Sequence, residues 1–254
     1  MKRPLWVVAG LLVIAMATPL MAQNDMKEKS PIYIYISEWS IPRAQWADME
    51  KSEASDQTML QSAMSAGTLV AYGSDVNLVH QPDGYTHDDW WVSTSMAGVL
   101  NMLDQFYKAG SSASPVLTSA TRHEDSIDVS RHYNWKAGTY KGAYTHGSTY
   151  KLKADAPDDA VALLSKSFLV PFLEKMMSEG AIVEYDIDTE AIHTDAPGTF
   201  LLFYTAANAE GLDKVNQGLQ QMLKASPLDG PAFGSMVDFT AHRDYLFRTN
   251  ATFK

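Results

Sequence analysis

The sequence contains no cysteine, which excludes thiol nucleophiles, thiolate metal sites and disulfide bridges. Several enzyme motifs are also absent. There is no GxSxG turn of a serine hydrolase, no GxGxxG dinucleotide loop, no Gly-Lys-Ser phosphate loop and no HExxH zinc motif. Serine hydrolases, nucleotide-dependent enzymes and zincin-type proteases are therefore not supported by the sequence.

Long apolar runs are missing as well, apart from one run near the N-terminus. Lys2 and Arg3 precede the apolar residues 5–17, and "TPLMAQ" follows. This layout predicts a signal peptide over residues 1–22, cleaved after Ala22, and then a linker over 23–30. The run is shorter than the ~20 residues of a membrane span. We expect an exported bacterial protein, periplasmic or extracellular, without a stable membrane anchor after cleavage; a retained N-terminal anchor is the alternative.

Basic residues are scarce. The full chain has 20 Lys and Arg against 30 Asp and Glu, and the predicted signal peptide removes two of the basic residues. The mature chain of 232 residues then carries 18 basic and 30 acidic residues, a net charge of −12. A negative field of this size disfavours binding to nucleic acids and to anionic membrane surfaces. We expect neither as a partner.

A pattern of Thr-x-His-x-Asp occurs twice. It reads "TRHED" at residues 121–125 and "TAHRD" at 240–244. Two further matches precede it in the same order: "SAGTLVAYGSDVNLVH" with "SEGAIVEYDIDTEAIH", and "LDQFYKA" with "LQQMLKA". Three ordered matches indicate an internal duplication. We take residues 31–135 and 140–254 as two copies of one unit, joined by residues 136–139.

Each copy shows the same predicted order of elements: strand, helix, strand, strand, helix, strand. In the first copy, strands are expected at 32–39, 69–79, 89–95 and about 117–125, with helices at 42–67 and 97–110. In the second, strands are expected near 143–152, 181–192, 199–206 and 235–244, with helices at 157–179 and 208–224. This order is the ferredoxin-like βαββαβ arrangement. We predict an α+β fold in which two tandem repeats pack sheet to sheet as a pseudo-dimeric α/β barrel.

With this element order, the chain resembles the dimeric α/β-barrel superfamily, which includes antibiotic-biosynthesis monooxygenase-like, EthD-like, muconolactone isomerase-like and chlorite dismutase-like proteins. The resemblance covers nearly all of residues 31–254 and rests on no diagnostic motif. It therefore identifies no subfamily, and no catalytic residue is carried over. The resemblance implies that the fused pair replaces a homodimer, so we expect a monomer or a dimer of fused chains.

Strand alternation predicts which side chains face the cleft between the two sheets. On the first strand, Ile32, Ile34 and Ile36 are assigned to the helices, and the aromatic residues Tyr33, Tyr35 and Trp39 to the cleft. On the last strand, Thr240, His242 and Asp244 are assigned to the cleft, and the duplication places Thr121, His123 and Asp125 there too. A His beside a carboxylate is suited to general-base catalysis near neutral pH. The alternative is that Thr and His satisfy backbone groups while the Asp caps a turn.

The stretch "EYDIDTE" (184–190) places four carboxylates on one strand face, while Val183, Tyr185 and Ile187 alternate with them as core. It lacks the glycine and the spacing of a calcium loop. The first copy does not repeat the cluster. We interpret it as a solvated acidic face, with a position facing the cleft between the sheets as the alternative, and predict no metal site.

The sequence favours an exported protein that binds a small, partly apolar ligand in the cleft, through Tyr33, Tyr35, Trp39, Thr121 and Thr240. One alternative is a cofactor-independent enzyme, isomerase- or monooxygenase-like, with His123 or His242 as base and Asp125 or Asp244 as its partner. A second alternative is a structural exported domain without a ligand. No cofactor is expected; a haem enzyme is a further alternative, which a Soret band would support.

Overall fold

The computed structural model describes residues 28–81, 84–192 and 197–254. The expected signal peptide and most of the linker that follows it lie outside the described residues. Within the described ranges, no helix is both long enough and apolar enough to cross a membrane.

Eight antiparallel strands form one closed barrel in the order β1-β3-β2-β8-β5-β7-β6-β4. Each half of the chain supplies four neighbouring strands with the ferredoxin-like order, and the halves join where β2 pairs with β8 and β4 with β6. The predicted pair of repeats forming an α/β barrel is confirmed. The strands are β1 (Ile32–Trp39), β2 (Ala71–Asn77), β3 (His87–Ser93), β4 (His123–Trp135), β5 (Gly138–Lys151), β6 (Glu184–Glu190), β7 (Thr199–Ala206) and β8 (Arg243–Phe253).

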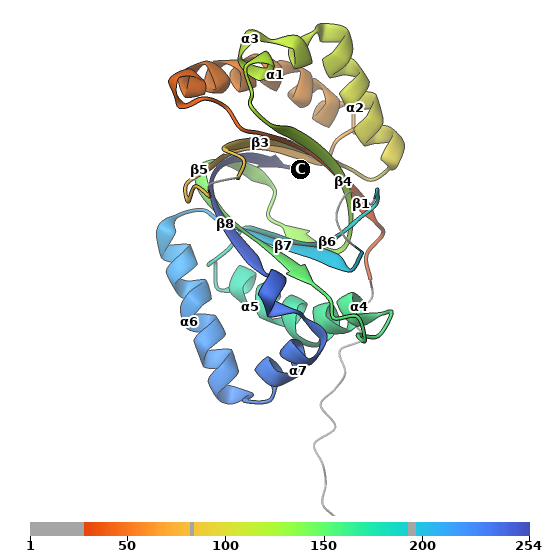
Figure 1. The fold of residues 1–254 in the computed structure, drawn as a ribbon, viewed down its shortest axis with the longest axis vertical. Helices are drawn as coiled ribbons and strands as arrows, with labels where there is room; N and C mark the ends of the chain where they lie inside the picture. Colours follow the sequence, from red (N-terminus) through yellow and green to blue (C-terminus); the bar gives the residue numbers. More distant parts are fainter. Residues whose placement is uncertain (1–27, 82–83, 193–196) are drawn as a thin grey trace, which may run out of the picture.

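Helices cover the barrel from two opposite sides (Figure 1). On one side the helices pack on the first sheet through a core that includes Leu69, Trp91 and Met102. On the other side they pack on the second sheet around Tyr185 and Phe200. The first group is α1 (Trp46–Ser65), α2 (Met96–Ala109) and α3 (Pro115–Thr118); the second is α4 (Ala160–Leu164), α5 (Val170–Ser178), α6 (Ala209–Ala225) and α7 (Asp229–Met236).

The closing strand of each half begins later than the sequence predicted. The prediction of a strand near 117–125 is wrong because Ser114 caps a short helix with Pro115 at its first turn, and β4 begins only at His123. The prediction near 235–244 is wrong because α7 occupies residues up to Met236. The Thr-x-His-x-Asp pattern therefore stands at the entry of each closing strand.

A close helix-to-backbone contact is duplicated at the start of the second helix of each half. Ser95 caps α2 by accepting a hydrogen bond from the backbone N of Gly98, and Asn208 caps α6 in the same way through Gly211. A Cβ atom at Gly98 would lie 3.1 Å from the carbonyl oxygen of Thr68, and one at Gly211 would lie 2.3 Å from that of Ala181. Both helices approach the sheet so closely that these positions have no room for a side chain.

Candidate functional site

The strand faces are the reverse of those predicted for β1. Ile32, Ile34 and Ile36 line the interior of the barrel, whereas Tyr35 and Trp39 project outward beneath the helices of the first half. Tyr35 stacks on Trp91 with ring centroids 4.3 Å apart. The physical reason is that a closed barrel has two dry faces, so an apolar alternation alone does not show which face carries the helices.

A cavity of about 670 Å³ lies between α1, α2 and the outer face of β1, β3 and β2. We call it the outer cavity. This volume is typical of small-molecule sites. Its wall is largely aromatic and apolar, and its polar residues include two of the predicted site residues. Lining residues include Tyr35, Ser37, Trp39, Glu53, Asp89, Trp91, Leu103, Phe106, Tyr107, His123 and Asp125.

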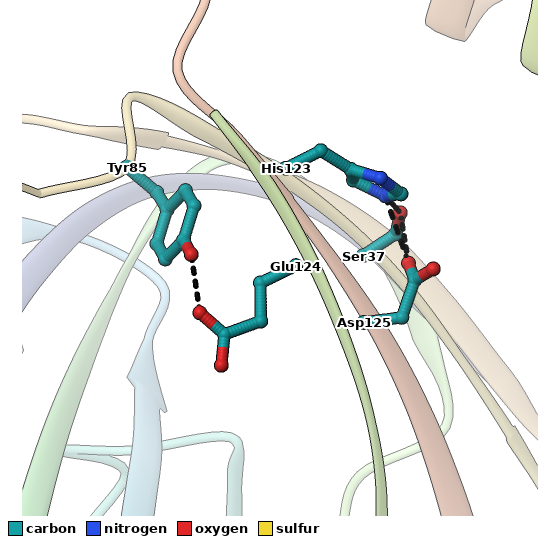
Figure 2. A network of polar contacts seen from close by, with 5 residues as sticks. All are labelled: Ser37, Tyr85, His123, Glu124 and Asp125. Atoms are coloured by element: carbon teal, nitrogen blue, oxygen red, sulfur yellow. Dashed lines mark hydrogen bonds and ion pairs between the residues drawn. The ribbon is translucent and has the colours of Figure 1, made fainter. Parts of the chain in front are cut away.

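His123 and Asp125 form a direct contact on the rim of this cavity (Figure 2). His123 Nε2 lies 2.9 Å from Asp125 Oδ1, although the two side chains alternate along one strand at ~7 Å per step. Trp39 lies opposite His123 in the strand register and stacks on its ring with centroids 3.6 Å apart, which holds the imidazole flat along the strand.

Ser37 completes this network from β1. Its hydroxyl donates to Asp125 Oδ1 at 2.8 Å and lies 3.1 Å from His123 Nε2. Because the Ser37 hydroxyl and His123 Nε2 both point at Asp125 Oδ1, the tautomer that satisfies these contacts carries its proton on Nε2 and leaves Nδ1 as an acceptor. Ser37 therefore does not give its proton to His123, which excludes a nucleophilic serine activated by this histidine.

The same arrangement recurs in the second half. Ser148 on β5 donates to Asp244 Oδ1 at 2.7 Å, and His242 Nε2 lies 3.0 Å from the same oxygen but, unlike His123, makes no hydrogen bond among the described residues. Tyr150 stacks on His242 in the place that Trp39 takes on His123. His242 and Asp244 do not line the outer cavity. The side chain of His242 is also less exposed than that of His123, at 24% against 38%.

The remaining predicted ligand residues lie outside the cavity. Thr121 is exposed, and its hydroxyl donates to the carbonyl oxygen of Ser40. Thr240 donates through its backbone N and its hydroxyl to Asp238, which caps the turn before β8. Tyr33 packs against the helix-side core of the first half. The structure therefore brings together Tyr35, Trp39, His123 and Asp125, and separates them from both threonines.

Burial raises the pKa values of three side chains that line the outer cavity. Removal from water, reinforced by the neighbouring Asp89 carboxylate, raises the pKa of Glu53 on α1 to about 9. Burial likewise raises the pKa of Asp89 to about 7. Burial first, and then the Asp125 carboxylate, raise the pKa of Tyr35 far above its usual range. Near neutral pH, Glu53 and Tyr35 are therefore neutral hydrogen-bond donors.

Sequence reasoning missed the polar lining of the barrel interior, where a second cavity of about 260 Å³ lies. We call it the inner cavity. The acidic stretch 184–190 was expected to face solvent, and this is wrong for Glu184 and Asp188, which are 6% and 1% exposed. The inner carboxylates come from β1, β2, β3, β4 and β6: Glu38, Asp75, Asp88, Glu124, Asp128, Glu184, Asp186, Asp188 and Glu190.

Three of the residues that line the inner cavity, Tyr85, Arg122 and Glu124, contact one another. Tyr85 donates a short hydrogen bond to Glu124, and Figure 2 shows both side chains on the opposite side of β4 from His123 and Asp125. Arg122 forms an ion pair with Glu124 at 3.2 Å and stacks over the ring of Tyr85. The alternation along β4 thus sends His123 and Asp125 to the outer cavity and Glu124 to the inner one.

A chain of buried hydroxyls runs across the four strands of the second half. Thr249 on β8 donates to Thr145 on β5 at 2.6 Å, Thr145 contacts Thr205 on β7 at 2.8 Å, and Thr205 donates to Glu184 at 2.8 Å. Thr249 also pairs in register with Asp75 on β2. Among the described residues, no three His, Asp or Glu side chains are grouped closely enough to hold a metal ion.

Comparison with solved structures shows which proteins share this fold. No family model and no curated protein matches the sequence. Two similar solved structures are described as a "putative monooxygenase". The one from Lactobacillus acidophilus has a TM-score of 0.59 at 13% identity, covering 89% of this chain and 97% of that one. The one from Fusobacterium nucleatum has a TM-score of 0.62 at 7% identity, covering 89% and 95%. An anthrone oxidase-like protein matches with a TM-score of 0.52 at 10% identity, covering 88% and 94%.

The chain has the dimeric α/β-barrel fold. Coverage of both partners is nearly complete, so the likeness extends over both halves of the barrel. At these identities the likeness is one of fold, and the chemistry of this dimeric α/β barrel must be argued from its own residues.

Proposed function

We propose that this dimeric α/β barrel binds a small, partly apolar organic molecule in the outer cavity. The observation that carries the proposal is a cavity of about 670 Å³ with an aromatic wall and the Ser37–His123–Asp125 network on its rim. Sites of this size and composition usually use a few placed polar groups to orient an apolar ligand. The ligand site is thus on the helix side of the first sheet, away from the space between the sheets.

The polar groups of the cavity complement one another. Nδ1 of His123 makes no hydrogen bond within the described residues and can accept one from a ligand. The protonated Glu53 carboxyl can donate, whereas the Tyr35 phenol already faces the Asp125 carboxylate. Trp39, which stacks on His123 with one face, is an aromatic side chain that a ligand can contact. This set fits a ligand with an apolar body and a polar edge that both donates and accepts.

Binding in the outer cavity should depend on His123 and not on its counterpart in the second half. We expect native mass spectrometry of gently purified mature protein to show added mass above the polypeptide. His123→Ala should reduce the occupied fraction by about tenfold or more, because it removes a polar anchor of a partly buried site. His242→Ala is the matched control, because it disrupts the same local network outside the cavity. Equal loss in both variants, or retention in both, would contradict the proposed location.

A second candidate function is proton transfer without a cofactor. Glu53 supports it, because its Oε1 atom is buried without a hydrogen-bond partner among the described residues and its carboxyl is protonated near neutral pH. A neutral carboxylic acid and a neutral imidazole in one cavity can stabilise and form an enolate at a carbonyl substrate. Two similar folds belong to candidate monooxygenases and one to an anthrone oxidase-like protein, so chemistry on carbonyl and aromatic compounds is a suitable starting panel.

Hydrogen–deuterium exchange of candidate substrates tests this second function. Carbonyl compounds with acidic C–H bonds are incubated with the protein in D₂O, and their exchange is followed by NMR. His123→Ala and Glu53→Gln should each slow the exchange by about a hundredfold, the size of a typical general acid or base contribution. The idea fails if the exchange rate of every responsive compound is the same in wild type and in both variants.

We also propose that the protein is exported and that residues 1–22 are removed, because the N-terminus has the charged, apolar and small-residue regions of a signal peptide. Fractionation of bacterial cells that express a C-terminally tagged chain should recover the protein outside the cytoplasm, with Gln23 as its first residue. Deletion of residues 1–22 should retain it inside. Equal distribution of both forms would contradict export.

A further inference from the structure

We propose that the inner cavity binds an aliphatic diamine or short polyamine through its buried carboxylates. This site is separate from the outer cavity, because it lies inside the barrel and is reached from the opposite face of the strands. Four features support the proposal: the balance of charge, an unpartnered buried carboxylate, the spacing of the acidic groups, and the apolar lining between them.

The charge inside the barrel is strongly unbalanced. Nine inner carboxylates line the cavity, and Arg122 is the only basic side chain among the described residues that line it. The Arg122 guanidinium is already engaged by Glu124 and by the ring of Tyr85. Buried carboxylates are costly unless they are paired or protonated, so the interior requires positive charge from protons or from a ligand.

Asp188 is the strongest single indication of a ligand. Its residue is 1% exposed, and neither carboxylate oxygen accepts a hydrogen bond of good geometry from a described residue; the nearby Ser130 hydroxyl lowers the pKa of Asp188 but donates to the carbonyl oxygen of Ile187. One carboxylate oxygen of Asp75 and one of Asp88 are also buried and unpartnered, although Trp90 donates to the other oxygen of Asp75 at 3.0 Å. Native proteins rarely leave such atoms unsatisfied without a functional reason or an unseen partner.

The spacing of these groups favours a ligand with separated charges. Glu184, Asp186 and Asp188 follow one another at alternate positions of β6, in steps of ~7 Å. Asp75 and Asp88 face each other across β2 and β3. A single metal ion needs its ligands within 2–3 Å, and the described donors are not grouped in that way. Two ammonium groups joined by a short methylene chain match the longer steps.

The remaining lining suits the methylene chain. Ile34, Val92 and Phe247 line the same cavity between the acidic positions. Trp90 adds an aromatic face beside Asp75, and aromatic faces attract ammonium groups. A cavity of about 260 Å³ is large enough for a diamine or triamine and too small for a bulky amphiphile.

Without a bound amine, several inner carboxylates should be protonated near neutral pH. Binding of an ammonium group should displace these protons. Burial raises the pKa of Glu184 to about 8 and that of Asp188 to about 7, and burial raises the pKa of Asp75 to about 6. The other groups that face them are the rest of the inner carboxylates, with Arg122, Tyr85 and Tyr245. An ammonium group lowers these pKa values when it binds, so binding near neutral pH releases protons to the buffer.

Isothermal titration calorimetry of the mature protein with 1,4-diaminobutane and with spermidine tests the proposal. We expect one ligand per chain, and a heat that changes between two buffers of different ionisation enthalpy because protons are released. Asp188→Asn and Asp75→Asn should each weaken binding by about tenfold or more. The control Asp213→Asn removes an exposed carboxylate on α6 and should leave the affinity unchanged. Butylamine, with one ammonium group, should bind about tenfold or more weakly than 1,4-diaminobutane.

Several results would overturn the proposal. One is no heat from either amine at millimolar concentration, and another is an affinity that Asp188→Asn and Asp75→Asn leave unchanged. Butylamine that binds as tightly as the diamine would refute the role of charge spacing. Calcium that binds more tightly than the amines and is lost in Asp188→Asn would assign the cavity to a metal instead. Circular dichroism of each variant shows that the fold is retained, so that a loss of binding is a loss of the site.

Discussion

Raising the pH from about 6.5 to about 8.5 should lower the Tm of the mature protein by about 10 °C. The cause is the set of buried carboxyl groups whose pKa values are raised. Burial raises the pKa of Asp188 and of Asp89 to about 7, of Glu184 to about 8 and of Glu53 to about 9. In the unfolded chain these groups have lost their protons by pH ~5.

The direction follows from the protons that each state binds. Between the unfolded and folded pKa values, the folded state binds more protons than the unfolded state, so the free energy of unfolding falls as the pH rises. One excess proton bound by the folded state over two pH units corresponds to about 2.7 kcal/mol of unfolding free energy. Because more than one group titrates between pH ~6.5 and ~8.5, we expect the free energy of unfolding to fall by about 4 kcal/mol. Burial lowers the pKa of His87 to about 4, and this acts in the opposite direction only below pH ~6.5. The carboxyl groups with raised pKa outnumber His87, so stability still falls with pH in that range, and its maximum should lie at pH ~5.

Thermal unfolding followed by circular dichroism in a series of buffers measures this dependence. Glu53→Gln together with Glu184→Gln should make it much shallower, because these two carboxyls have the highest pKa values of the four and an amide has no proton to lose. The exposed Asp213→Asn variant should follow the wild type. A Tm that stays constant or rises between these pH values would show that the inner carboxylates are ionised and satisfied in the folded state.

Gly211→Ala should lower the free energy of unfolding by about 3 kcal/mol and the Tm by about 9 °C. The added Cβ would lie 2.3 Å from the carbonyl oxygen of Ala181 and 2.8 Å from the Cβ of Ala206. Both neighbours are fixed, one as backbone and one as a methyl group on β7, so α6 must move away from the sheet. The helix propensity gained by replacing glycine with alanine, about 1 kcal/mol, is too small to offset this.

Gly218→Ala is the matched control on the same helix. A Cβ at Gly218 would meet the Sδ and Cε atoms of Met176 at 2.9 Å, and the end of a flexible methionine can move. We expect a Tm within a few degrees of wild type, because the gain in helix propensity offsets the adjustment of Met176. Urea unfolding of both variants measures the two free energies. Equal losses in the two variants would show that helix position is not fixed by the Gly211 contact.

Most helices and strands could be predicted from local patterns, because apolar residues repeat every second position in a strand and about every 3.6 positions in a helix. The alternating residues 32–39 and 199–206 match β1 and β7, and the amphipathic stretches near 97–110 and 208–224 match α2 and α6 within two residues. The closing strands could not be placed, because the capped turn at Ser114 and Pro115 and the helix α7 precede them. Because the two copies were interpreted in the same way, the start of the closing strand was misplaced in both, β4 and β8.

The site was predicted only in part. The repeated His-x-Asp pattern drew attention to His123 and Asp125, and Tyr35 and Trp39 share their cavity. The face of β1 could not be decided, because isoleucines suit a barrel interior as well as a helix interface. Ser37 and Glu53 could not be found, because their roles depend on contacts across strands and between α1 and the sheet. The acidic stretch of β6 could not be assigned to the inside or the outside, because both faces of a barrel strand can carry polar residues.

Because the two halves are joined in one chain, the sequence of each half can change independently of the other. A homodimer of one such unit carries two identical sites, and every substitution in one site appears in the other. Here the pair has diverged: Trp39 and His123 border the outer cavity, whereas Tyr150 and His242 stack within a cluster that includes Phe233 and Phe239. One half can therefore change its aromatic residues to suit a ligand, while its twin keeps the same histidine and aspartate as packing that supports the shared barrel.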